Sequence, residues 1–312
     1  MENFIIAFNV VVPLFILIII GYLIRKARLI TEISLKELNS LVYNVFLPVL
    51  LFNNMYHISF DGEIEFGIIL YSVISILLIF GILCLIVPIF EKQRKKASTM
   101  IQGMYRSNFA LFGIAVTESM YGVGNAGITG ILVAVIVPLF NILAVCLFEI
   151  YKGDKVNINE IIRGIIKNPL LIGTLSGFIF KVSGIIFPVV IEQSLEKVGS
   201  LAAPVALIVL GGTFKFGKLI ENRKRLIVIV FVRLILIPFV FIILSILYGY
   251  REKELFALYI MFGSPTAVAS FAMAGAMGGD AEMAGQIVVL TTIMSLFSCI
   301  LGIFVMKAVG VI

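Results

Sequence analysis

Long apolar runs, separated by short polar or glycine-containing segments, repeat along all 312 residues of the chain. Runs of about twenty residues are long enough, at about 1.5 Å per helical residue, to cross a hydrocarbon core about 30 Å thick. Charged residues and Gly or Asn clusters set the ends of each run. The pattern predicts an all-α membrane protein with ten transmembrane helices, over residues 4–24, 35–56, 65–90, 99–119, 125–150, 161–180, 195–214, 225–249, 255–276 and 283–308.

The composition supports this prediction, because 61% of the residues are hydrophobic and only 13% are charged. Soluble domains are about half apolar and about a quarter charged. The longest polar stretch, Tyr151–Arg163, leaves no room for a soluble domain. The three cysteines (Cys84, Cys146 and Cys299) lie inside apolar spans, so we expect them to be packing residues rather than disulfide or zinc ligands.

Lys and Arg are distributed unequally between the two sides of the predicted spans. Seventeen fall in the first, third, fifth and seventh connections and five on the opposite side. Because connections rich in Lys and Arg stay in the cytoplasm, we expect an inner-membrane protein with both termini outside. The net charge of +6 then reflects loops that face anionic lipid, and no nucleic-acid partner is expected.

The second half of the sequence resembles the first. Residues 35–41 match 195–201, and residues 106–110 match 263–267, at offsets of 160 and 157. With five helices in each half, the second half must be inverted in the membrane. The sequence therefore predicts a 5+5 inverted repeat, with one repeat in residues 1–150 and the other in 161–312. Repeats of this kind place the substrate site at the midplane, between discontinuous helices.

The fourth and ninth spans carry polar or helix-breaking residues at matching depths. Ser107 and Asn108 lie in the fourth span, and Ser264, Pro265 and Thr266 lie in the ninth. Ser264-Pro265 reads as an N-cap followed by proline at the first position of a new helix. Two helix N-termini that meet at the midplane would form a site for an anion, preferably a carboxylate. A proline kink packed against neighbouring helices is the alternative.

Two arginines lie inside spans. Arg106 could attract an anion or could snorkel to the cytoplasmic interface, and we expect Arg233 to snorkel. In the second and seventh spans, Asn44, Pro48 and Pro204 are expected to line the cavity, with a packing kink as the alternative.

Several functional classes lack their residues in this sequence. No Asp or Glu lies at mid-span, which argues against proton transport on a buried carboxylate and against aspartyl proteolysis. His57 is the only histidine, and no P-loop motif occurs. We therefore expect no enzyme, no metal site and no cofactor, although coupling to H⁺ or Na⁺ stays open.

Five short motifs extend across the chain, at 44–48 (NVFLP), 106–113 (RSNFALFG), 168–170 (NPL), 204–207 (PVAL) and 264–267 (SPTA). Together they resemble the auxin efflux carrier family, whose bacterial members include malate and other organic-acid permeases. The family has Gly-Ile-Pro where this chain has Gly113-Ile114-Ala115. A break in the fourth helix would therefore depend on Asn108, Gly113 and tertiary packing.

The resemblance implies that the fourth and ninth helices are broken and cross at unwound segments, and that Asn108 binds substrate. It also implies a scaffold of helices one, two, six and seven, with a possible homodimer through it, beside a transport core of helices three to five and eight to ten.

The sequence thus predicts a secondary transporter for small organic anions, embedded in the lipid bilayer. Two alternatives remain. One is a sodium-coupled symporter of the same fold, with oxygen ligands from Thr291, Thr292 and Ser295. The other is a membrane sensor that binds a ligand without transporting it.

Overall fold

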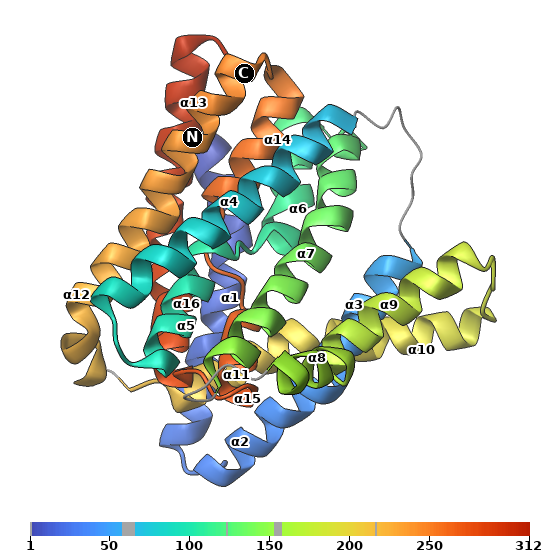
Figure 1. Cartoon of the computed structure of the whole chain (residues 1–312), viewed down its shortest axis with the longest axis vertical. Helices are drawn as coiled ribbons and strands as arrows, with labels where there is room; N and C mark the ends of the chain where they lie inside the picture. Colours follow the sequence, from blue (N-terminus) through green and yellow to red (C-terminus); the bar gives the residue numbers. More distant parts are fainter. Residues whose placement is uncertain (1, 58–65, 123, 153–157, 216) are drawn as a thin grey trace.

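The computed structural model describes residues 2–57, 66–122, 124–152, 158–215 and 217–312, and these residues form helices and no named strand (Figure 1). The helices are α1 (Glu2–Lys26), α2 (Glu32–Leu41), η1 (Val42–Phe46), α3 (Leu47–Tyr56), α4 (Phe66–Phe90), α5 (Arg94–Tyr105), α6 (Phe109–Tyr121), α7 (Gly127–Tyr151), α8 (Ile158–Ile166), α9 (Pro169–Val182), α10 (Val189–Ser200), α11 (Ala202–Thr213), α12 (Gly217–Phe231), η2 (Val232–Leu236), α13 (Ile237–Tyr248), α14 (Glu252–Gly263), α15 (Ala269–Ala276) and α16 (Ala281–Val309). Within the described residues, six helical segments are long and apolar enough to cross a membrane, and α6 and α9 are shorter apolar helices.

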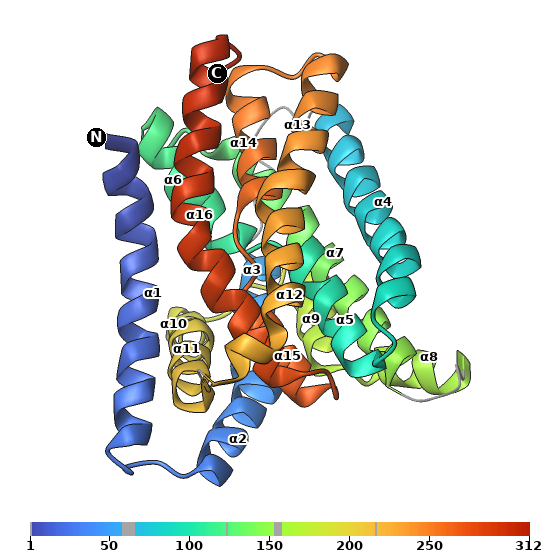
Figure 2. The same cartoon turned by 90° about the vertical axis from the view of Figure 1, so that its left-hand side faces the viewer.

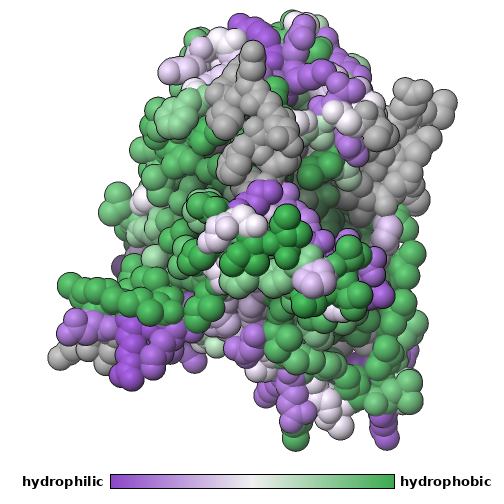
Figure 3. All heavy atoms as spheres, turned by 90° about the vertical axis from the view of Figure 1, so that its right-hand side faces the viewer, coloured by the Kyte–Doolittle hydropathy of each residue, from purple (hydrophilic) through white to green (hydrophobic). Residues whose placement is uncertain are grey.

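The predicted span 161–180 is wrong at its start, because residues 158–182 form two helices. Asn168 lies between these two helices and caps the second, α9, where its side chain accepts a hydrogen bond from the backbone N–H of Leu170 at 2.9 Å. Pro169 follows in the first turn of α9. The short helix α8 is amphipathic, with Ile158, Ile162 and Ile166 exposed along one face. It projects at the lower left of Figure 3, with a hydrophobic upper surface above a hydrophilic one.

Two π-helical turns, η1 and η2, each lie just before a proline, Pro48 and Pro238. Proline has no backbone N–H and so leaves one helical bond unmade. In both places the backbone N–H of the residue before the proline donates to the carbonyl five residues earlier, and not to the one four residues earlier as in an α-helix. These bonds join Leu47 to Val42 and Ile237 to Val232. The helices therefore continue through these prolines with one extra residue in the turn.

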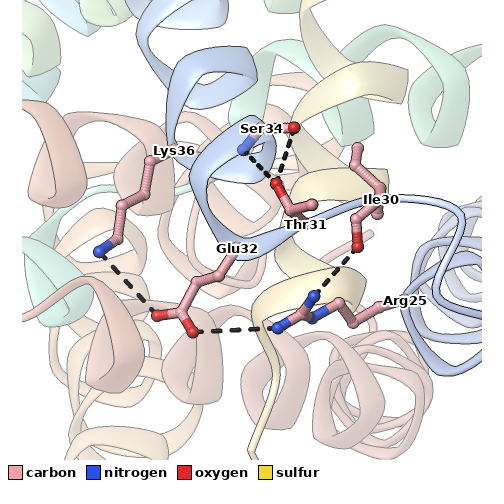
Figure 4. A network of polar contacts seen from close by, with 6 residues as sticks. All are labelled: Arg25, Ile30, Thr31, Glu32, Ser34 and Lys36. Carbon is pink, nitrogen blue, oxygen red and sulfur yellow. Dashed lines mark hydrogen bonds and ion pairs between the residues drawn. The ribbon is translucent and has the colours of Figure 1, made fainter.

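The connection between α1 and α2 is held by a small polar network (Figure 4). Thr31 caps α2 by accepting the N–H of Ser34 at 3.1 Å. Glu32, in the first turn of α2, lies 3.9 Å from both Arg25 and Lys36. These contacts position α2 directly after α1.

Close helix packing joins α1 to α11 and α3 to α9. A Cβ atom at Gly21 would overlap the carbonyl of Ile208, and one at Gly211 would overlap the carbonyl of Ile18. Small residues at such contacts let helix backbones approach closely, which is a common way of joining helices in lipid. The remaining long helices, α4, α7, α12–α13 and α16, surround the interrupted helices α5–α6 and α14–α15 (Figure 2).

Candidate functional site

Two chain interruptions meet inside the molecule. Helix α5 ends at Tyr105 and α6 begins at Phe109, while α14 ends at Gly263 and α15 begins at Ala269. The N–H of Asn108 donates to the carbonyl of Pro265 at 2.7 Å, and the N–H of Ala267 donates to the carbonyl of Arg106 at 3.2 Å. These bonds form one antiparallel bridge between Ser107 and Thr266. We call residues 106–108 and 264–268 the paired breaks.

The expectation that Ser264-Pro265 starts a helix is wrong. Ser264 instead follows the end of α14, where its hydroxyl donates to the carbonyl of Ile260 at 2.6 Å. Pro265 cannot continue α14 because it has no N–H, and α15 begins only after Val268, which makes no side-chain cap. Ser264, Pro265 and Thr266 thus shape the break, and the hydroxyl of Thr266 donates to the carbonyl of Gly103 at 2.7 Å.

Arg233 does not snorkel to an interface, so that expectation is also wrong. Its side chain is only 1% exposed. The guanidinium donates to the carbonyl of Ser264 at 2.7 and 2.9 Å and to that of Met104 at 3.2 Å. Longer contacts of 3.4 Å reach the carbonyls of Tyr105 and Met261. Because helix C-termini carry partial negative charge, Arg233 neutralises the ends of both α5 and α14.

On the side away from Arg233, where the paired breaks lead into α6 and α15, lies a cavity of about 260 Å³. Its wall includes the residues that open α6 and α15, namely Asn108, Ala110, Val268 and Ala269. The first amides of a helix have no partner within it and carry partial positive charge. Two helix N-termini therefore lie at the same cavity.

Side-chain donors add to this positive character. Arg106 also lines the cavity, is 5% exposed, donates to Oδ1 of Asn141 at 2.6 Å and contacts the sulfur of Met273. Arg106 therefore does not snorkel to the cytoplasmic interface, which was one of the two possibilities for this residue. Three further buried atoms have no hydrogen-bond partner in the described part of the chain: Oγ of Ser107, Nδ2 of Asn108 and Nδ2 of Asn141. Buried polar atoms are normally paired, so these atoms can receive a ligand.

Asn108 differs from Asn168, which occupies the same position before a helix. The Asn168 side chain caps α9, whereas Asn108 makes no side-chain cap on α6. Among the described residues, Nδ2 of Asn108 is therefore buried and without a partner, in a residue that lines the cavity. Ala115 lies within the continuous helix α6, after the break, so this interruption forms without the proline that the family resemblance led us to expect there.

Among the described residues that line the cavity, none is acidic. Asn54 and Ser200 contribute further polar groups to its wall. Searched over the same residues, no cluster of three or more His, Cys, Asp or Glu side chains could hold a metal ion. The cavity thus offers one guanidinium, unpaired donors and two helix N-termini, an arrangement that suits an anion.

The cavity adjoins a second, larger one of about 810 Å³ that reaches the end of α3 and the start of α7. The two share six lining residues, Leu50, Leu51, Asn54, Ala110, Val137 and Ser200. At the other end, α15 packs against α2 and α11, and Nδ2 of Asn39 donates to the carbonyl of Ala272 at 3.2 Å. Among the described residues, the larger cavity thus lies on one side of the site, and α15 and α2 cover the other side.

Three residues expected at the cavity do not line it. Asn44 is exposed, and its amide donates to the carbonyl and hydroxyl of Ser40 at 2.8 and 3.0 Å. Pro48 packs against Gly173 of α9, and Pro204 is half-buried in α11 while its neighbours face the cavity.

Asn54, Asn141 and Ser200 line the cavity although they were not expected there. Asn141 carried a signal, because it is the only asparagine in the apolar run of α7. A polar residue in such a span commonly faces the interior of a bundle.

The comparison with protein families gives one match. A family model described as membrane transport protein matches residues 6–161 and 155–303, which together cover nearly the whole chain. None of the curated proteins matches the sequence.

Proposed function

Because this chain belongs to the membrane transport protein family, the family of the auxin efflux carriers, we propose that it is a secondary transporter for small organic anions such as dicarboxylates. As a multi-pass membrane protein of this family it is a transporter. We place the substrate at the paired breaks, in contact with Arg106, Ser107 and Asn108.

The observation that carries this proposal is the surplus of donors at a cavity without a lining carboxylate. A substrate carboxylate accepts several hydrogen bonds and would occupy donors that are otherwise buried and unpaired. Arg106 supplies the charge, and Asn141 holds the guanidinium in place at 2.6 Å. The α6 and α15 amides add positive potential without a proton that titrates.

The architecture favours transport by alternating access. We propose two inverted repeats, residues 1–150 and 161–312, whose fourth and ninth helices cross at the paired breaks. The near two-fold character of the bridge between Ser107 and Thr266 supports this arrangement. In this proposal α1–α3 and α9–α11 form a scaffold, which could dimerise, and the other helices move against it. We also propose an inner-membrane location with both termini outside, which would place the larger cavity on the outer side.

A transport assay tests the site. Protein reconstituted in liposomes should take up labelled malate, and Asn108→Ala should reduce uptake by about tenfold or more, since a bond to a charged group contributes about 1.5–3 kcal/mol. Asn44→Ala is a matched control, because Asn44 is exposed and does not line the cavity. Normal uptake by Asn108→Ala would remove the assignment of the site.

The sodium-coupled alternative gains no specific support from its named residues. The hydroxyls of Thr291 and Thr292 donate to carbonyls of their own helix at 2.7 and 2.6 Å, and Oγ1 of Thr291 also accepts the N–H of Thr266. Uptake that is unchanged when sodium is replaced by potassium would eliminate this alternative. Ligand binding without flux in tight liposomes would instead indicate a sensor.

A further inference from the structure

A second large cavity lies on the outer surface of the bundle, away from the paired breaks. It has a volume of about 1160 Å³ and lies between α4 on one side and α12–α13 on the other, with Met100 and Met104 of α5 at its floor. Helix α4 packs on α5 and α7, whereas α12 packs on α5 and α16, and the cavity lies over α5 between them. We call this space the lateral groove.

Polar contacts between α4 and α12–α13 lie at both ends of the lateral groove. At one end the hydroxyl of Tyr71 donates to the carbonyl of Phe241 at 2.8 Å and accepts from Ser245 at 3.0 Å. At the other end Arg225 donates to Glu91 at 2.5 Å. Burial raises the pKa of Glu91, but the Gln93 amide and Arg225 lower it by more, so the net pKa lies below its ordinary value and the pair stays charged at neutral pH.

Between these ends the lining is apolar and its length matches one lipid leaflet. On α4 the lining runs from Ile79 to Phe90, about 16 Å at helical rise. Half of a hydrocarbon core of about 30 Å has nearly this thickness. Ile82 and Ile86 are 50% and 46% exposed, so this apolar surface is open at the side of the bundle.

Charge is confined to one end of the lateral groove. Arg223 and Lys224 line it there and are exposed, and no ion pair of either is recorded among the described residues. Arg225 is paired with Glu91, and Glu221 is the one other acidic residue of the lining. This end, which we call the mouth of the lateral groove, therefore has two cations without an ion pair in the described part of the chain, Arg223 and Lys224, and one further carboxylate, Glu221.

We propose that the lateral groove binds an anionic phospholipid, with its acyl chains along α4 and α12–α13 and its phosphate on Arg223 and Lys224. An apolar slot one leaflet deep with a basic mouth fits this molecule at both ends, as basic pockets between transmembrane helices bind anionic head groups. A second copy of the chain would have to present a helix to the apolar part while leaving two cations without partners. The proposal does not depend on the transported substrate.

The chain contains no tryptophan, so one introduced tryptophan can report on local lipid. Ile82→Trp places the probe in the lateral groove, and Leu85→Trp places it on the same helix at a residue that is 75% exposed and outside the lining. Each variant is reconstituted in liposomes with brominated phosphatidylglycerol or brominated phosphatidylcholine, and quenching gives the preference between the two lipids.

We expect residue 82 to favour phosphatidylglycerol roughly fivefold for each cation that contacts the phosphate, and residue 85 to show no such preference. Adding R223E/K224E should abolish the preference at residue 82. Adding K26E/R28E, an equal charge change at two exposed residues at the end of α1 and just after it, should leave it unchanged.

Three results would overturn the proposal. Equal preferences at residues 82 and 85 would mean that the groove does not select a lipid. A preference that survives R223E/K224E would place the phosphate elsewhere. Quenching at residue 85 but by neither lipid at residue 82 would show that protein, such as a second copy, covers the groove.

Discussion

Arg233→Met tests the role of the buried guanidinium that joins the two interrupted helices. The substitution keeps an unbranched apolar side chain but removes all donors to the carbonyls of Ser264, Met104, Tyr105 and Met261. Those carbonyls end α5 and α14 and lie where water cannot replace the lost bonds. We expect the paired breaks to lose their fixed geometry.

The magnitude follows from the three contacts at 2.7, 2.9 and 3.2 Å. Hydrogen bonds between side chains and helices in membranes contribute about 0.6 kcal/mol on average and up to about 1.7 kcal/mol each, which gives about 2–5 kcal/mol for the set. Methionine also removes the cost of burying a charge, so we expect the lower end, about 2 kcal/mol. This corresponds to a fall in melting temperature of about 4–8 °C.

The assay is thermal unfolding in detergent, followed with a thiol-reactive dye. Cys299 is buried, and Cys84 and Cys146 are half-buried, so unfolding exposes native thiols. Arg223→Met is the matched control, because Arg223 is exposed on α12 and should unfold like the parent protein. Arg233→Lys should lie between Met and Arg, since an ammonium keeps the charge but cannot reach all the carbonyls. A melting temperature of Arg233→Met equal to that of the parent, with normal transport, would refute the reasoning.

Three further predictions concern the cavity and the scaffold. Arg106→Met should weaken the stabilisation of the protein by carboxylates about tenfold or more in ligand concentration, as measured by thermal shift, and Arg106→Lys should retain part of it. Gly211→Val should lower the melting temperature, because a Cβ there overlaps the carbonyl of Ile18, whereas Gly81→Val should not, because nothing lies within 4 Å of a Cβ at Gly81. Ser200→Cys, in a background without the native cysteines, should react with an impermeant maleimide from the side to which the cavity opens, and bound substrate should slow the reaction.

The sequence predicted an all-helical membrane protein because hydrocarbon thickness and apolar run length are directly linked, but it could not say which face of a helix points inward. Asn44 and Asn54 lie in the same span, and only Asn54 reaches the cavity. The run around them is apolar on all sides, so no 3.6-residue period distinguishes the faces. The π turn η1 also adds a residue between them and rotates every later side chain by about 100°.

Arg233 shows a different limit of the sequence. Its partners are backbone carbonyls, which are the same in every residue, and they lie as many as 129 positions away in the chain. Nothing in side-chain identity marks them. Ser264-Pro265 was misread for a related reason: a serine before a proline is compatible with the start of a helix, and only the surrounding packing makes Ser264 the residue that ends α14.

The two buried arginines divide the paired breaks by charge. Arg233 neutralises the carbonyl ends of α5 and α14, so their partial negative charge does not reach the cavity. The N-terminal ends of α6 and α15 have no such compensation and lie at the cavity, together with Arg106. A single interruption would place one positive and one negative helix end close together, with little net potential. Two interruptions joined back to back, with Arg233 on their carbonyl side and Arg106 at the cavity, give the cavity a positive potential, and no described residue of its lining is acidic. This is why we expect its ligand to be an anion.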